Sequence, residues 1–308
     1  MGDVLKRGSL TYFASGASTS RVGDSERYEF GKNWKRFAAG LTELQLEEAA
    51  SSLKRMLAAP IAGRTFLDAG CGSGLFSLAA VRLGAARVHA FDVDLESVAC
   101  AQSLKDRYAP HESAWTIERG DLLDGQYLRD VGPWDVVYCW GVAHHTGALW
   151  NALDNLRHVV APRGTLFLAV YNDQGSWSKR WARIKRLHNS GRLGRALTWA
   201  MCFPYFVGGA FAKDVLSGRN PRSRYTEYYR RRGMSRFADL RDWLGGYPFE
   251  VAKPEQLLDF YRSHGFNLVR LKTCGGSLGC NEYVFERDAH VTERASLTAH
   301  FAPDPQTR

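Results

Sequence analysis

Acidic and glycine residues occur together at one turn of the chain, where a short apolar run ends. Residues 65–67 lead into Asp68, and Gly70, Gly72 and Gly74 follow in a G-x-G-x-G spacing before a helical pattern begins. A strand, a glycine turn and a helix in this order are typical of the first unit of a parallel α/β fold. Glycine lets the backbone approach a ligand closely, and the helix N-terminus presents unpaired N–H groups. The turn therefore predicts a site for a nucleotide-like molecule.

The spacing of the glycines separates two classes of nucleotide-like ligand. Dinucleotide-binding turns read G-x-G-x-x-G or G-x-G-x-x-A, but Leu75 stands at the third small position. The carboxylate of Asp68 would repel a pyrophosphate, and it can accept hydrogen bonds from an ammonium group. The turn therefore favours the amino-acid end of S-adenosylmethionine over a dinucleotide.

Here the sequence resembles the class I S-adenosylmethionine-dependent methyltransferases, whose first motif is an apolar strand, an acid and G-x-G-x-G. Further motifs follow in the family's order over about residues 60–172: a strand ending in an acid (87–92), a turn (120–123), a fourth strand (134–140) with residues 141–145 after it, and a fifth strand (164–170). The resemblance implies that Asp92 holds the ribose hydroxyls and that the turn at 120–123 contacts adenine. The full set of implied cofactor contacts is Asp68, Gly70, Cys71, Gly72, Gly74, Asp92, Val93, Asp121, Leu122 and Trp140.

An aromatic and cationic segment, residues 27–37, precedes this core. One interpretation is an N-terminal segment that Phe30, Trp34 and Phe37 attach to the core. The other is a lid, because related enzymes often close the cofactor pocket with N-terminal residues, and Trp34 would then contact the cofactor. Residues 1–26 are polar and predict a mobile arm.

Candidate catalytic residues follow the fourth and fifth strands. Methyl transfer is an in-line displacement in which positioning supplies much of the rate, but an oxygen or ammonium nucleophile must also lose a proton. His145, and after it His144, are the candidate bases because histidine ordinarily has a pKa near 6.5; packing is the alternative role. Asp173 is a second candidate, and Tyr171 and Asn172 are predicted to orient the substrate at the sheet's carboxyl edge.

A segment rich in glycine and aromatic residues, 243–250, lies further along the chain. It predicts either a rigid connector or a wall of the acceptor pocket. In the second case Tyr247 and Glu250 would face the substrate.

Strands alternate with helices through the core, which predicts an α/β fold. We expect a doubly wound, mostly parallel seven-stranded sheet with an antiparallel last strand and a helical cap inserted after the fifth strand. The expected units are an N-terminal arm and lid helices (1–58), the S-adenosylmethionine-binding core (59–175), the basic cap (176–250), the end of the sheet (251–288) and a tail (289–308).

Positive charge is concentrated in the predicted cap. Residues 175–241 hold 16 lysines and arginines and three acids, which is an excess of 13 positive charges. Because the whole chain has a net charge of +9, the remaining residues carry a net charge of −4. A basic cleft concentrates anions, so we expect a small anionic acceptor such as a carboxylate, a phosphorylated sugar or a natural-product intermediate, with Arg230, Arg231 and Arg232 serving it. The alternative is an RNA-modifying methyltransferase that holds nucleic acid with the basic insertion, although no RNA-binding module is recognisable. A dehydrogenase or non-catalytic protein is disfavoured by the glycine spacing and the terminal strands.

An apolar run, residues 199–211, lies inside the basic cap. It is too short for a transmembrane segment, which needs about 20 residues, so it predicts either a buried cap helix or an interfacial membrane contact flanked by basic residues. The six cysteines contain no C-x-x-C pair, and we expect reduced thiols in a cytoplasmic protein without a metal. A homodimer remains open as the oligomeric state.

Overall fold

The computed structural model describes residues 31, 34, 37, 38, 40–57, 59–218, 220, 223, 236–276 and 279–289. The predicted arm, the tail beyond residue 289 and the arginines at 230–232 lie outside these residues. Seven strands form one sheet in the order β3-β2-β1-β4-β5-β7-β6. Their bounds are β1 Thr65–Ala69, β2 Arg87–Asp92, β3 Trp115–Arg119, β4 Trp134–Trp140, β5 Val160–Tyr171, β6 Phe266–Lys272 and β7 Cys280–Arg287.

The direction of the strands confirms the predicted fold class. Strands β1 to β5 pair in parallel, whereas β7 pairs antiparallel with both β5 and β6. The strand order reverses between β1 and β4, and at such a reversal the carboxyl ends of parallel strands leave a crevice for a ligand.

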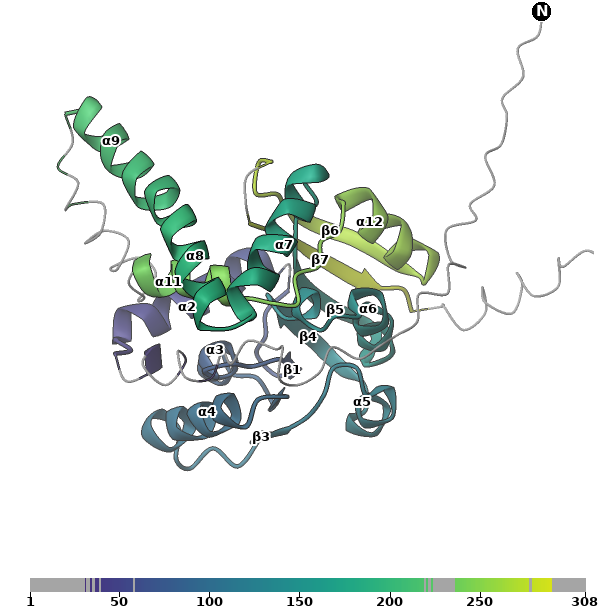
Figure 1. Ribbon diagram of the computed structural model, residues 1–308. Coiled ribbons are helices and arrows are strands. Elements are labelled where there is room, and N and C mark those ends of the chain that lie inside the picture. The colour runs from purple at the N-terminus through teal and green to yellow at the C-terminus, as the bar shows by residue number, and fades with distance from the viewer. Residues whose placement is uncertain are drawn as a thin grey trace, which may run out of the picture.

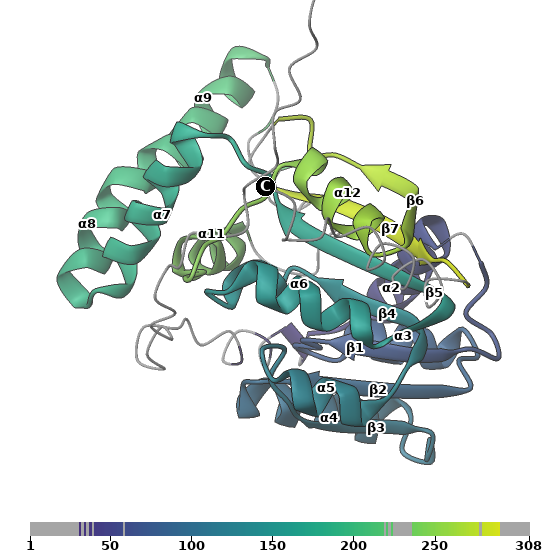
Figure 2. The same ribbon diagram turned by 90° about the vertical axis from the view of Figure 1, so that its right-hand side faces the viewer.

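Helices cover both faces of the sheet and bury its apolar side chains (Figure 1; Figure 2). One face packs against α5 (Gly125–Val131), α6 (Leu149–His158) and α12 (Pro254–Ser263). The other packs against α2 (Glu43–Met56), α3 (Leu75–Arg82) and α4 (Leu95–Tyr108). A capping box begins α2, with the Thr42 backbone N–H donating to Gln45 Oε1 at 2.8 Å.

The chain between β5 and α12 forms a separate helical layer. It comprises α7 (Ser176–Asn189), α8 (Arg192–Phe203), a π-helical segment η3 (Pro204–Gly208), α9 (Gly209–Leu216) and α11 (Arg236–Gly245). Trp181, Cys202, Leu240 and Leu244 form the buried centre of this layer. We refer to α7–α11 as the cap.

Candidate active site

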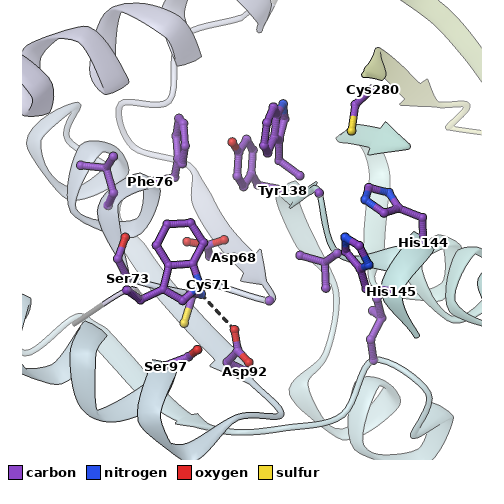
Figure 3. A pocket seen from close by; sticks show the side chains of 18 of the residues that line it. Asp68, Cys71, Ser73, Phe76, Asp92, Ser97, Tyr138, His144, His145 and Cys280 are labelled. Atoms are coloured by element: carbon purple, nitrogen blue, oxygen red, sulfur yellow. Dashed lines mark hydrogen bonds between the residues drawn. The ribbon is translucent and has the colours of Figure 1, made fainter. Parts of the chain in front are cut away.

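Asp68 lies at the end of β1 with its carboxylate almost completely buried, at 3% exposure. The Ser77 hydroxyl of α3 donates a hydrogen bond to it at 2.5 Å. Burial, against the opposing effect of the Ser77 hydrogen bond and with a smaller contribution from nearby Asp92, raises the pKa of Asp68 to about 7. No cation forms an ion pair with this carboxylate within the described residues, so the site is suited to a positively charged group of a ligand (Figure 3).

The turn requires glycine at its three positions for different structural reasons. Gly70 and Gly72 adopt φ of +82° and +53°, a region that favours glycine. A Cβ on Gly72 would lie 2.9 Å from Cε2 of Trp34, so this side chain packs directly over the turn. Gly74 precedes α3, and a Cβ there would meet Ala101 at 2.9 Å. Gly74 therefore serves helix packing, and it does not line the cavity.

Asp92 lies beside this turn at the end of β2. Its carboxylate accepts the backbone N–H groups of Gly72 and Asp94, each at 3.0 Å. Burial raises the pKa of Asp92 to about 6, although these backbone hydrogen bonds lower it. Asp94 caps α4 and also accepts the Gly31 N–H at 2.9 Å, which attaches the N-terminal segment to the cofactor side of the site.

A cavity of about 1160 Å³ extends from this turn across the carboxyl edge of the sheet. It brings together fourteen of the residues predicted from the sequence: Trp34, Asp68, Gly70, Cys71, Gly72, Asp92, Val93, Asp121, Leu122, Trp140, His144, His145, Tyr171 and Tyr247.

Three other predicted site residues do not line the cavity, because their side chains have structural partners. Asn172 accepts a hydrogen bond from the Asn281 side chain at 3.0 Å, and Asp173 accepts the Gly175 N–H at 2.8 Å. Both carboxylate oxygens of Glu250 accept the Leu149 N–H at 3.1 Å, at the N-terminus of α6. Asn172, Asp173 and Glu250 therefore lie outside the cavity lining, and their side-chain oxygens are bonded within the protein.

The two histidines form the cavity wall opposite Asp68 (Figure 3). His145 Nδ1 lies 2.7 Å from the Pro248 carbonyl oxygen, which can only accept, so Nδ1 carries the proton. Burial, and next the Lys185 charge, lower the pKa of His145 to about 3. This value lies below the ordinary histidine pKa near 6.5 that made His145 a candidate base.

His144 differs from its neighbour in its hydrogen bonding. Its Nδ1 is buried and has no hydrogen-bond partner among the described residues. In the neutral tautomer that carries the proton on Nε2, this Nδ1 is a free acceptor for a donor group of a ligand. Burial and the neighbouring His145 and Lys185 hold the pKa of His144 well below its usual value.

Lys185 of α7 is a functional candidate that the sequence analysis missed. The side chain is fully buried, and its ammonium group donates to the Trp243 carbonyl. It also lies 4.2 Å, 4.9 Å and 5.8 Å from the ring centres of Trp243, Phe249 and Tyr171. Burial lowers the pKa of Lys185 to about 7. By residue type it could not be separated from the other cations of the cap. Its helical spacing from Trp181 and His188, which are buried on the same side of α7, could have indicated that Lys185 is buried as well.

Aromatic rings connect these groups into one wall. The rings of His144 and Tyr171 are 4.0 Å apart, and those of Tyr171 and Phe249 are 5.0 Å apart. The segment after α11 holds the wall in place, since the Glu250 N–H donates to the His144 carbonyl at 3.0 Å. On the far rim, Glu282 accepts from the Trp140 indole at 3.4 Å and from Lys272 at 3.2 Å.

The cofactor half of the cavity fits S-adenosylmethionine. The buried Asp68 carboxylate suits the ammonium group, the positive-φ glycines admit close approach, and the Asp92 carboxylate can accept ribose hydroxyls. Within the described part of the chain, no cluster of histidine, cysteine and acidic side chains could hold a metal ion.

Comparison with known proteins agrees with this geometry. The family model described as a methyltransferase domain matches residues 41–211, more than half of the chain. Ribosomal protein L11 methyltransferase of Methylococcus capsulatus is 48% identical over 120 residues, which are 39% of this chain and 38% of that protein. Ubiquinone biosynthesis O-methyltransferase of Caulobacter vibrioides is 32% identical over 120 residues, 37% of this chain and 43% of that protein. The chain thus spans less than half the length of these curated relatives.

A solved structure supports the fold. An O-methyltransferase family protein from Burkholderia thailandensis superposes with a TM-score of 0.50 at 11% identity, covering 85% of this chain and 59% of that chain. Fold, cavity and family model agree. The chain belongs to the methyltransferase domain family.

Proposed function

We propose that the protein methylates an oxygen or nitrogen of a small acceptor that carries negative charge and binds against the wall of His144, His145 and Tyr171. The unsatisfied His144 Nδ1 carries this proposal. A buried acceptor atom without a partner costs free energy, and an acceptor molecule with an O–H or N–H group would supply the missing donor. The flat rings around it favour a planar or apolar body for the same molecule.

The chemistry follows from the position of this nitrogen. S-adenosylmethionine supplies an activated methyl group. As the acceptor's oxygen or nitrogen forms its bond to the methyl carbon, the carbon–sulfur bond breaks and the acceptor's proton becomes strongly acidic. His144 Nδ1 can take that proton late in the reaction, although its pKa is lowered. Orientation of the nucleophile by the same hydrogen bond adds to the rate.

The negative charge of the acceptor is supported by Lys185. The charge of Lys185 is buried among rings and a carbonyl, without an acidic partner in the described part, so an anion in front of Tyr171 would lower the cost of that charge.

The decisive experiment is transfer of a labelled methyl group from S-adenosylmethionine to fractionated small molecules, to RNA and to ribosomal proteins. We expect label in anionic small molecules and in neither macromolecule. Label in RNA would replace this proposal by the nucleic-acid alternative.

His144→Ala and His144→Gln test the residue. The alanine variant should lower kcat by about 10²–10⁴-fold at unchanged cofactor affinity, whereas the glutamine variant, which keeps an acceptor atom, should recover part of kcat. An alanine variant with more than about a third of wild-type kcat would leave positioning by other groups as the mechanism.

A further inference from the structure

The helices α8 and α9 follow one another along a single axis and extend away from the body of the protein in both views (Figure 1; Figure 2). On α8, Leu193, Leu197 and Met201 are 75%, 53% and 53% exposed. Residues four apart lie on one side of an α-helix, so these side chains form an apolar stripe on its outer side. The other side of α8 is packed, since Gly194, Thr198 and Cys202 are buried.

The exposed apolar surface continues at the far end of this axis. Phe211, Val215 and Leu216 of α9 are exposed. Nine of the sixteen exposed large apolar side chains of the described residues lie between 177 and 216. Single exposed apolar residues need no explanation, but such a concentration marks an interaction surface. Among the described side chains of the predicted run 199–211, Cys202, Trp199 and Phe206 pack in the centre of the cap, whereas Met201, Phe203 and Phe211 are exposed.

Exposed positive charge lies on the same helices as this apolar surface. Helices α7 to α9 contain eight lysines and arginines and one acid, Asp214, which is itself buried. Six of the cations are exposed and form no ion pair with another described residue: Lys179, Arg180, Arg183, Arg186, Arg192 and Arg195. A partner that complements this surface combines an apolar region with negative charge.

We propose that the outer side of α7–α9, here called the cap surface, docks on an anionic lipid bilayer. A helix with an apolar stripe and basic flanks lies in the plane of the membrane interface, with its apolar side chains among the acyl chains. A second copy of the chain would also cover the stripe, but it would bring two cationic surfaces together. The helices would lie on the bilayer, because no helix of the described chain has the length and apolarity to cross one. This surface is independent of the acceptor proposed above.

Vesicle flotation with the full chain tests the proposal. We expect binding to vesicles of phosphatidylcholine with about one third phosphatidylglycerol, little binding to phosphatidylcholine alone, and release as salt is raised. The double variant Leu197→Glu, Met201→Glu should bind the anionic vesicles at least about tenfold more weakly. Arg180→Gln, Arg183→Gln, Arg186→Gln should weaken binding by about 100-fold, from roughly 1 kcal/mol per cation.

Leu44→Glu is the matched control, because Leu44 is an exposed leucine on α2 and not on the cap surface. It should bind vesicles as the wild type does. Unchanged cofactor affinity and circular dichroism establish that each variant is folded. The proposal is overturned if the wild type fails to float with anionic vesicles, or if the Leu197→Glu, Met201→Glu variant floats equally well. It is also overturned if sedimentation shows a dimer that this variant dissociates, which would assign the surface to a second copy.

Discussion

The pH dependence of cofactor binding should report the ionisation of Asp68. In the free protein, burial holds the pKa of this carboxyl at about 7, above its ordinary value of 3.8. The ammonium group of the cofactor interacts favourably only with the ionised form. Affinity should therefore rise as the pH rises through about 7 and become constant above it.

The magnitude follows from the ionised fraction. With a pKa of about 7, about one carboxyl in eleven is ionised at pH 6, so affinity should be about tenfold lower than at high pH, or about 1.4 kcal/mol. The stability of the free folded protein depends on pH in the opposite direction. Because the folded pKa is raised, the protonated carboxyl stabilises the free protein at low pH, and this stability is lost as the pH rises toward 7.

Isothermal titration calorimetry between pH 5.5 and 8.5 measures the effect, and buffers of different ionisation enthalpy count the protons released. Asp68→Asn keeps an acceptor for the Ser77 hydroxyl but has no charge. It should lose about 3–5 kcal/mol of cofactor binding at pH 8, as for a broken buried ion pair, and its affinity should no longer depend on pH near 7.

Asp121→Asn is the control, because Asp121 lines the same cavity and its carboxylate accepts the Leu123 N–H at 2.9 Å. Its variant should keep the wild-type pH dependence even if its affinity is lower. A wild-type affinity that is constant between pH 5.5 and 8, or an Asp68→Asn variant that binds normally, would refute the assignment of Asp68 to the ammonium group.

Three further predictions concern the cavity. Gly72→Val should abolish cofactor binding by calorimetry, because its backbone has φ +53° and a Cβ would contact Trp34; normal affinity would contradict the assigned turn. Asp92→Ala should cost about 1.5–3 kcal/mol of cofactor binding with acceptor KM unchanged, and equal losses for both ligands would make Asp92 a structural residue. Lys185→Met should raise the pKa of His145 above its value of about 3, because it removes the neighbouring ammonium charge; an unchanged imidazole titration by NMR would show that burial alone sets this pKa.

The cofactor half could be predicted from the sequence because its residues depend on local order. A strand, an acid and a glycine turn occupy a few consecutive positions, and the next acid ends the next strand. The parallel register places Asp68 beside Ala90 and so brings both strand ends to one edge. Helix α5 was harder to predict than these motifs. It has only seven residues and begins at the N-cap Asp124, so it shows little apolar periodicity.

The acceptor half could not be predicted as well, because its contacts join distant segments. Glu250 caps a helix that begins 101 residues earlier, and no spacing in the sequence shows this. Lys185 could not be separated from exposed cations by residue type. Tyr171 and Tyr247 do line the cavity, which agrees with their position at a strand end and in the connector after the cap.

The position of Lys185 connects the cap surface with the catalytic wall. Helix α7 directs Lys185 and Trp181 inward and Arg180, Arg183 and Arg186 outward. Lys185 on its inner side donates to the Trp243 carbonyl. The chain continues from Trp243 to Pro248, whose carbonyl accepts from His145 Nδ1, and to Glu250, whose N–H donates to the His144 carbonyl. A displacement of α7 on binding an external surface would therefore act, through the Trp243 carbonyl and the chain from 243 to 250, on the His145 ring and on the His144 backbone. Since packed interiors transmit strain, kcat measured with and without anionic vesicles should differ if α7 moves, and should be equal if docking leaves α7 in place.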